Sequence, residues 1–188
     1  HYGLAVALGG VEMTMEDLVR LYAMLANGGL LRPLRARVGD PRPEGTRLLS
    51  EESSFMLLDI IKDNPRPSQG LSAGWTQGAL PVHWKTGTSY AFRDAWSVGV
   101  FGHYVLAVWV GDFAGESNPA FVGVEAAAPL MFEIIDALKS QEPGMDGPAQ
   151  PGRRRLAQVE VCSVSGQIPG PACRGRKTTW FIPGKSPI

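Results

Sequence analysis

The chain has 188 residues, 44% of them apolar, and its Lys and Arg residues balance its Asp and Glu residues in number. This length and composition support one medium-sized domain, or a domain with a small module, around a genuine hydrophobic core. They exclude wholesale disorder. The longest apolar run, residues 104–110, is far shorter than the roughly 20 residues of a membrane-spanning helix.

The first residue is a histidine, and no segment has the layout of a signal peptide. We therefore expect the chain to be a piece of a longer protein, whose targeting and anchoring signals lie in a preceding segment. Contact with a membrane is then expected only through that segment.

Charge is distributed unevenly along the chain. Residues 151–188 hold seven basic residues and one acid, whereas the first 150 residues carry a net charge of −6. Such an asymmetry is typical of separate modules. A basic segment can contact nucleic acid or anionic lipid, but solvated charge on a small domain explains it more simply. We therefore predict no nucleic-acid partner.

Cys162 and Cys173 are the only cysteines, and both lie in the basic segment. Ten residues with two glycines and two prolines separate them, so the chain can turn back and close a disulfide. Free thiols and a metal site are the alternatives, although two cysteines without a histidine pattern make a poor zinc site. We favour the disulfide, which would indicate an oxidising compartment, and we expect no metal and no organic cofactor.

Two helices are predicted in the first third of the chain. Thr14 is suited to cap the first, in which apolar residues recur at helical spacing, and the Asn27-Gly28-Gly29 turn ends it. Ser50 is suited to cap the second, which continues to about Asp63. The segment 30–38 between them is predicted to be extended but irregular.

Three strands and a third helix are predicted next. The strands are expected at residues 82–88, 95–101 and 104–113, and the short connection between the last two indicates an antiparallel hairpin. Residues 126–139 have the apolar spacing of a helix. This order of elements predicts an α+β fold in which an antiparallel sheet is packed with helices.

Residues 141–152 have the composition of a linker, with three prolines and three glycines among twelve residues. We therefore predict a domain over residues 1–140, a linker over 141–152, and a small β-rich module over 153–188. The module is expected to hold one strand on each side of the cysteine loop. Residues 153–188 are called the C-terminal module below.

Lys85-Thr86-Gly87-Thr88, on the first predicted strand, is the one motif that indicates a chemistry. Alternate side chains of a strand share a face, so Lys85, Gly87 and Ser89 should point one way and the two threonines the other. The lysine offers positive potential to a carboxylate, the hydroxyls add hydrogen bonds, and Gly87 permits close approach. A main-chain N–H at the strand end can stabilise an oxyanion. The alternative is a solvated edge strand without a ligand.

Other residues near the motif have simpler explanations. His83 is a candidate base, but a polar residue on a strand beside a tryptophan is expected to be structural. Arg93 and Asp94 are expected to form a local ion pair or to fix the turn after the motif. Trp75 lies in the Gly- and Ser-rich segment before the strand. It is the tryptophan that we expect to contact ligand, since those on predicted strands are core residues.

Further segments surround the motif in a fixed order along nearly the whole chain. They are Leu8-Gly9-Gly10-Val11-Glu12-Met13-Thr14, Ala26-Asn27-Gly28-Gly29, Trp84-Lys85-Thr86-Gly87-Thr88-Ser89, Phe92-Arg93-Asp94-Ala95-Trp96, Val108-Trp109-Val110-Gly111, Cys162-Ser163-Val164-Ser165-Gly166 and Thr179-Trp180-Phe181-Ile182-Pro183-Gly184. In this order they closely resemble the second half of the transpeptidase domain, and the start of the C-terminal β domain, of bifunctional penicillin-binding proteins of the 1C group.

The resemblance implies a parent protein at the periplasmic face of the bacterial inner membrane, with a glycosyltransferase domain outside this chain. Its serine-type D,D-transpeptidase domain would cross-link peptidoglycan stem peptides and bind β-lactams. The resemblance also implies substrate-binding roles for Lys85, Thr86, Gly87, Thr88 and Ser89. Lys85 and Thr88 would take part in catalysis, with the Thr88 amide as an oxyanion donor. The C-terminal module would contact cell-wall synthesis proteins.

The family's two other motifs, Ser-x-x-Lys with the nucleophile and Ser-x-Asn, do not occur in these 188 residues. Acyl transfer needs an activated nucleophile within reach of its base. We therefore expect this chain alone to bind ligand without being acylated. The alternative function is a non-catalytic binding module of the cell envelope, whose basic, cysteine-containing tail recognises a partner or an anionic wall polymer.

Overall fold

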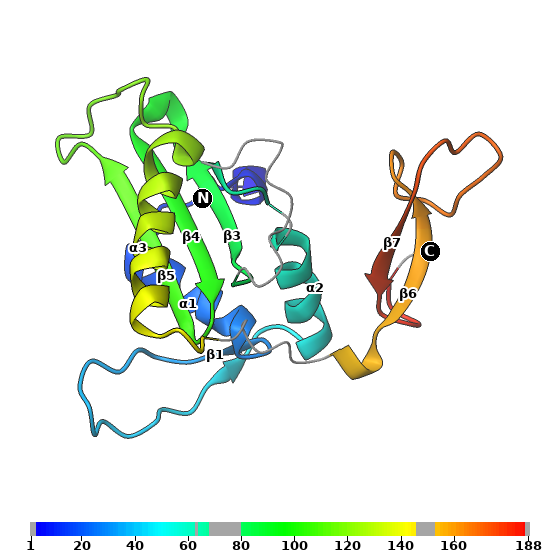
Figure 1. Cartoon of the computed structure of the whole chain (residues 1–188), viewed down its shortest axis with the longest axis horizontal. Coiled ribbons are helices and arrows are strands. Elements are labelled where there is room, and N and C mark those ends of the chain that lie inside the picture. The colour runs from blue at the N-terminus through cyan, green and yellow to red at the C-terminus, as the bar shows by residue number, and fades with distance from the viewer. Residues whose placement is uncertain (1–2, 63, 68–79, 146–152, 187–188) are drawn as a thin grey trace.

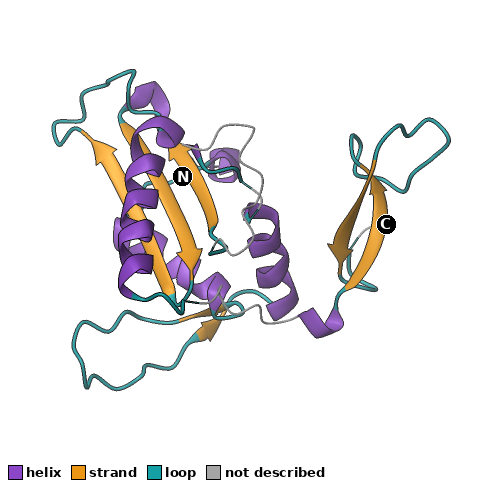
Figure 2. Cartoon of the chain, viewed as in Figure 1, coloured by secondary structure: helices purple, strands orange, loops and turns teal. Residues whose placement is uncertain are grey.

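The computed structural model describes residues 3–62, 64–67, 80–145 and 153–186. It is an α+β structure, as predicted, with antiparallel sheets packed against helices (Figures 1 and 2). In chain order the elements are η1 (Gly3–Leu8), α1 (Met15–Ala26), β1 (Leu30–Leu31), β2 (Thr46–Arg47), α2 (Glu51–Ile61), β3 (His83–Thr88), η3 (Tyr90–Phe92), β4 (Asp94–Phe101), β5 (Tyr104–Gly111), η4 (Gly123–Ala127), α3 (Ala128–Gln141), η5 (Arg153–Arg155), β6 (Ala157–Cys162) and β7 (Arg176–Phe181).

The central sheet has three antiparallel strands in the order β3-β4-β5. Lys85 lies opposite Val98 and Gly87 opposite Trp96, and β4 turns directly into β5. The predicted meander and its hairpin are confirmed to within one or two residues at each strand end. In this order β3, which carries the lysine motif, lies at an edge of the sheet.

One face of the sheet packs against α3 (Figure 1). Phe101 and Met131 are completely buried there. The Trp84 ring meets the Phe132 ring edge to face with centroids 5.1 Å apart, a geometry that aromatic pairs favour. This apolar layer fixes β3 and β4 relative to the start of α3.

The opposite face is covered by α1 and α2. Met24 of α1 and Leu58 of α2 are buried, as are Val98 and Val100 of β4. His83 is also buried, and its Nδ1 lies 2.8 Å from the Leu58 carbonyl oxygen. The histidine thus joins β3 to α2, which is the structural role expected for it.

The two predicted helix caps are present. The Thr14 hydroxyl accepts from the Asp17 N–H at 3.1 Å, and the Ser50 hydroxyl accepts from the Ser53 N–H at 3.1 Å. The predicted stop of the first helix is also present. The left-handed conformation of the Asn27-Gly28-Gly29 turn falls on Gly28 and Gly29, while Asn27 has φ of −87°, because glycine has no Cβ to strain.

Two local details were not predicted. Residues 32–38 form no regular element, as expected, but Leu30–Leu31 pairs with Thr46–Arg47 in a small sheet, and strands of two residues are too short to show alternation. The third helix begins at Ala128, two residues later than predicted, because a π-helical turn over Gly123–Ala127 precedes it. That turn lies beside the lysine motif.

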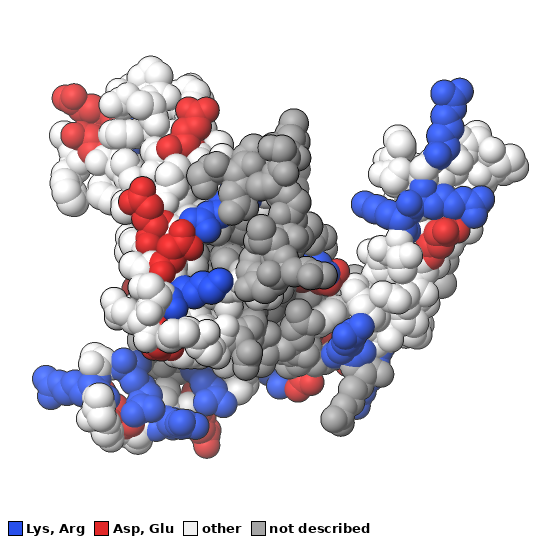
Figure 3. Space-filling model, in the orientation of Figure 1, with Lys and Arg blue, Asp and Glu red and all other residues white. Residues whose placement is uncertain are grey.

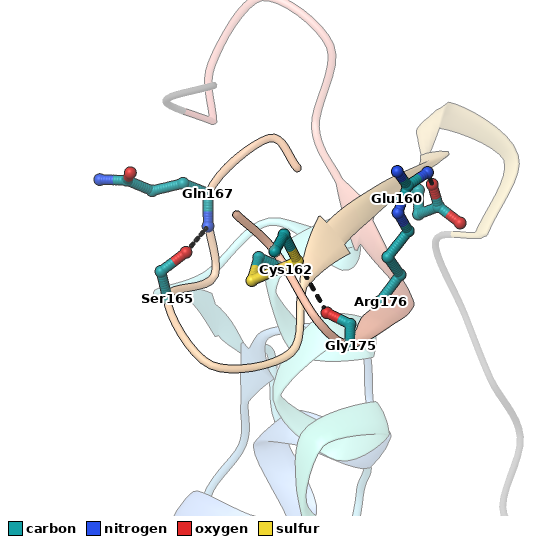
Figure 4. Close-up of a disulfide and its surroundings, with 7 residues drawn as sticks. Glu160, Cys162, Ser165, Gln167, Gly175 and Arg176 are labelled. Carbon is teal, nitrogen blue, oxygen red and sulfur yellow. Dashed lines mark hydrogen bonds and ion pairs between the residues drawn. A yellow bond between two sulfur atoms is a disulfide. The ribbon is translucent and has the colours of Figure 1, made fainter. Parts of the chain in front are cut away.

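The C-terminal module contains the antiparallel pair β6 and β7, which stands to one side of the sheet (Figure 1). A disulfide joins Cys162 to Cys173, with the Cα atoms 5.9 Å apart (Figure 4). Trp180 of β7 meets Phe55 of α2 edge to face at 5.4 Å, and the Arg153 guanidinium lies 5.0 Å from the same indole. The predicted division into domain and linker stays a prediction, and residues 146–152 lie outside the described part.

Basic side chains gather on the connection between β1 and β2 and on the C-terminal module (Figure 3). Arg32, Arg35, Arg37 and Arg42 all lie exposed on that connection. Over the described ranges, no helix is both long and apolar enough to cross a membrane.

Candidate functional site

The main chain of β3 offers hydrogen-bonding groups at its outer edge. In an antiparallel ladder, alternate residues direct N–H and C=O toward and away from the partner strand. The Trp84 carbonyl accepts from Asn64 Nδ2 at 2.6 Å, on the side away from β4. Thr86 and Thr88 lie two and four residues after Trp84 on the strand, so their main-chain N–H and C=O groups also point away from β4. The Thr86 carbonyl accepts from Lys85 Nζ at 2.9 Å, and the Thr88 N–H lies at the end of this edge.

The side chains of the motif alternate as predicted. Trp84 packs on α3, and the Thr88 hydroxyl accepts from the Gly123 N–H at 3.0 Å. The side chains of Trp84, Thr86 and Thr88 therefore face α3 and η4. Lys85 and Gly87 lie on the opposite face of the strand, together with His83. Lys85, Gly87 and Thr88 are exposed, and Thr86 is half-buried. The motif thus offers one ammonium, exposed main chain, one exposed hydroxyl and one half-buried hydroxyl near a single strand end.

Two glycines meet at this strand end, and they differ in what surrounds them. A Cβ at Gly87 would have Trp96 Cβ, at 3.6 Å, as its nearest neighbour, which is ordinary contact. A Cβ at Gly123 would lie 2.5 Å from the Gly87 carbonyl oxygen and 2.8 Å from that of Trp96. Packing among the described residues therefore requires glycine at 123 but not at 87. Sequence reasoning missed Gly123; the only signal was its position just before an alanine-rich helix start.

The turn after the motif is tightly held. The Ser89 hydroxyl accepts from the Asp94 N–H at 2.8 Å, and the Asp94 carboxylate accepts from Trp109 Nε1 at 2.9 Å. Between them, Ala91 and Phe92 have φ of +59° and +56°, a conformation that costs free energy for residues with a side chain. Asp94 therefore fixes this turn through Trp109, and Ser89 has a structural hydrogen bond within it.

A short segment at residues 64–67 joins β3 to the rest of the body. Besides the bond from its amide, Asn64 accepts from Trp84 Nε1 at 3.0 Å through its carbonyl oxygen. Arg66 forms an ion pair with Asp136 of α3 and lies 4.7 Å over the Phe132 ring. These contacts hold the strand against both α2 and α3. Trp75, the expected ligand contact, lies outside the described residues.

The described residues bring together no group of three or more His, Cys, Asp or Glu side chains that could hold a metal ion. The functional groups at the end of β3 are instead an ammonium, hydroxyls and main-chain amides. Such groups bind an anion such as a carboxylate or a phosphate, because each of them donates a hydrogen bond to it.

Comparison with known proteins gives three results. Residues 155–188 match the family model described as penicillin-binding protein 1A, C-terminal domain. The chain is 31% identical over 187 residues to penicillin-binding protein 1C of Escherichia coli, covering 98% of this chain and 24% of that protein. It is 41% identical over 91 residues to a protein named "Probable peptidoglycan D,D-transpeptidase FtsI" of Caulobacter vibrioides, covering 46% of this chain and 15% of that protein.

The fold also matches a solved structure. The crystal structure of penicillin-binding protein 1A from Haemophilus influenzae superposes with a TM-score of 0.72 at 19% identity, covering 98% of this chain and 34% of that chain. The chain is thus related along almost its whole length to the penicillin-binding proteins. The particular similarity to a 1C protein confirms the group that the motifs indicated. The chain spans about a quarter or less of the length of the curated relatives it matches.

Proposed function

We propose that this chain supplies the carboxylate-binding and oxyanion-binding wall of a serine-type D,D-transpeptidase that cross-links peptidoglycan. The observation that carries the proposal is the Lys85–Thr88 motif on the edge strand, with its outward amide, its exposed ammonium and an unfilled space above Gly87. The parent protein would act at the periplasmic face of the inner membrane and would also contain a glycosyltransferase domain.

In this function each group has one task. The Lys85 ammonium attracts the terminal carboxylate of a stem peptide or the carboxylate of a β-lactam, and the Thr86 and Thr88 hydroxyls donate hydrogen bonds to it. The Thr88 N–H donates to the oxygen on which negative charge develops when a serine attacks the carbonyl. Gly87 leaves room for the ligand backbone beside the strand. The nucleophilic serine comes from a part of the protein outside these 188 residues.

The second candidate is a non-catalytic binding module of the cell envelope. The basic surface of the C-terminal module (Figure 3) favours it, since clustered arginines and lysines attract anionic polymers or acidic partner proteins. This function does not need the lysine motif of β3, so the two candidates make different demands on Lys85.

An amide NMR titration with N-acetyl-D-alanyl-D-alanine tests the first candidate. We expect shifts at residues 86–89, and a loss of at least about tenfold in affinity for Lys85→Met, because a hydrogen bond to a charged group contributes roughly 1.5–3 kcal/mol. Lys177→Met, an exposed lysine on β7, is the matched control and should bind like the unmodified chain.

Two results would contradict the proposal. One is equal binding of the C-terminal amide of the dipeptide, which lacks the carboxylate. The other is unchanged affinity in Lys85→Met. A fluorescent penicillin should leave no stable covalent adduct on this chain, and an adduct detected by mass spectrometry would show that these 188 residues contain a nucleophile of their own.

A further inference from the structure

We propose that Gly123 is a positioning residue that sets the direction of the Thr88 hydroxyl. It acts through its main-chain N–H and through the close approach that its missing side chain allows. The inference rests on the proposed function in one respect, because it concerns how Thr88 meets a ligand carboxylate. Its structural content, the fixed hydroxyl, can be measured without any ligand.

The hydrogen bond determines which way the hydroxyl proton can point. A main-chain N–H only donates, so the Thr88 oxygen must be the acceptor in the 3.0 Å contact with Gly123. A threonine hydroxyl has one proton and two acceptor positions. With one acceptor position filled from the α3 side, the proton is left to donate elsewhere. Thr88 is exposed, so the proton is available to an anion at the edge of β3.

The Gly123 N–H is free for this task because of where it lies. It belongs to the first turn of the π-helical segment, where main-chain N–H groups have no partner within the helix. The same turn is closed behind it by bonds from the Glu125 and Ala126 N–H groups to the Val122 carbonyl. Single π-helical turns of this kind frequently occur at functional sites.

The missing side chain brings this N–H within reach of Thr88. A Cβ at position 123 would also lie 3.0 Å from Thr86 Cβ, in addition to its overlaps with the carbonyl oxygens of Gly87 and Trp96. Those oxygens belong to the paired strands β3 and β4, which cannot yield locally. Any larger residue must therefore move the start of α3 away from β3 and lengthen the bond to Thr88.

A fixed hydroxyl binds a carboxylate better than a rotating one, because the rotational freedom is lost before the ligand arrives. We expect Gly123→Ala to lower the affinity for N-acetyl-D-alanyl-D-alanine by about three- to tenfold, in the range of the net contribution of one ordinary hydrogen bond. Thr88→Val should cause a similar loss, and Thr88→Ser should stay within about twofold of the unmodified chain. Val124→Ala, at an exposed position of the same turn, is the matched control.

The double variant Gly123→Ala/Thr88→Val tests whether Gly123 acts on affinity through the Thr88 hydroxyl or by disturbing the strand as a whole. If Gly123 acts through the Thr88 hydroxyl, Gly123→Ala should change the affinity by less than about twofold in the Thr88→Val background, because coupled residues are not additive. An equal loss in both backgrounds overturns the proposal, since the substitution would then act by displacing the strand.

A second measurement needs no ligand and separates this inference from the proposed function. Scalar couplings should report a single Thr88 χ1 rotamer in the unmodified chain and rotamer averaging in Gly123→Ala. If the rotamer is fixed by Gly123 but the dipeptide does not bind, the proposed function fails and the positioning stands. If Thr88 averages equally in both proteins, the positioning is overturned.

A further pair of variants decides the question if Gly123→Ala does not fold. Thr88→Val removes the acceptor, and so it should accelerate hydrogen exchange of the Gly123 amide, whereas Thr88→Ser should leave that exchange unchanged. Equal protection of this amide in the two variants overturns the proposal.

Discussion

The body of the chain, residues 3–145, and the C-terminal module are stabilised by different means. The body buries apolar side chains on both faces of its sheet, whereas of the described residues of the module only Val161 and Cys162 are buried. The module instead has a disulfide and an ion pair between Glu160 and Arg176 (Figure 4), together with a docking contact on α2. A two-stranded hairpin is marginally stable by itself. The body should therefore depend on packing, and the module on its cross-link and its contact with α2.

The largest effect should come from opening the core of the body. Phe101 is completely buried between the sheet and α3, so Phe101→Ala should lower the free energy of unfolding by about 3–5 kcal/mol. Chemical denaturation followed by circular dichroism measures this loss. Phe113→Ala removes an aromatic ring that is 98% exposed and should cost less than about 0.5 kcal/mol. Similar losses for the two variants would show that the body does not depend on this core.

A smaller effect, confined to the module, should follow removal of the disulfide. Replacing Cys162 and Cys173 together by serine frees a short loop, and the lost constraint on the unfolded chain is about 2–3 kcal/mol. Amides of β6 and β7 should then exchange faster in hydrogen-exchange measurements, while those of β3–β5 keep their protection. Adding a reductant to the double serine variant should change nothing further. Equal loss of protection in the body would mean that the two regions fold as one unit.

The smallest effect concerns the docking of the module on α2 and its dependence on pH. Hydrogen bonds from its own N–H and from the Ser50 hydroxyl, together with the charges of Arg155 and Lys185, hold the pKa of Glu52 below its ordinary value of 4.5. A lowered pKa in the folded state stabilises the fold above the ordinary pKa, and this contribution is lost as the pH falls through the folded value. The two hydrogen bonds lie within the start of α2, and only the attraction to Arg155 and Lys185 acts across the contact with the module. Docking should therefore weaken slightly in acid.

NMR signals of the contact between Phe55 and Trp180, followed from neutral pH down to about pH 3, test whether docking weakens as the pH falls below the ordinary pKa of a glutamate carboxyl. Glu52→Gln should remove the step that titrates below pH 4.5. Glu51→Gln, at the neighbouring exposed position, should keep it. Persistence of the step in Glu52→Gln would assign it to another carboxylate.

Local signals predicted much of the fold. The caps at Thr14 and Ser50, the hairpin between β4 and β5 and the alternation of the Lys85–Thr88 strand all follow from residues within a few positions of one another. Interactions between residues this close in sequence can be predicted from the spacing of apolar residues and from capping and turn residues. The amino-acid sequence alone was therefore enough to place the motif on a strand, with its lysine and threonines on opposite faces.

The contacts that hold the site could not be predicted in this way. Asn64 bonds to Trp84 across 20 positions, and Gly123 bonds to Thr88 across 35. In each case the sequence shows a common residue in an ordinary setting, and only the packing of α2 and α3 on the sheet brings it to the strand. The short pairing of Leu30–Leu31 with Thr46–Arg47 was missed for a related reason, since its register depends on the turn at Gly29.

The position of β3 at the edge of the sheet has a further consequence, for solubility. A strand with outward amides is a template on which a second copy of the same strand can add, and such pairing leads to aggregation. Asn64 covers the Trp84 carbonyl of this edge, but in the proposed function Thr86 and Thr88 must stay open to a ligand and so cannot have a permanent neighbour. A charged lysine in the middle of the strand opposes such pairing, because pairing two like strands edge to edge brings like charges closer to each other. In the proposed function, the Lys85 charge that attracts a carboxylate would also repel a second copy of the strand.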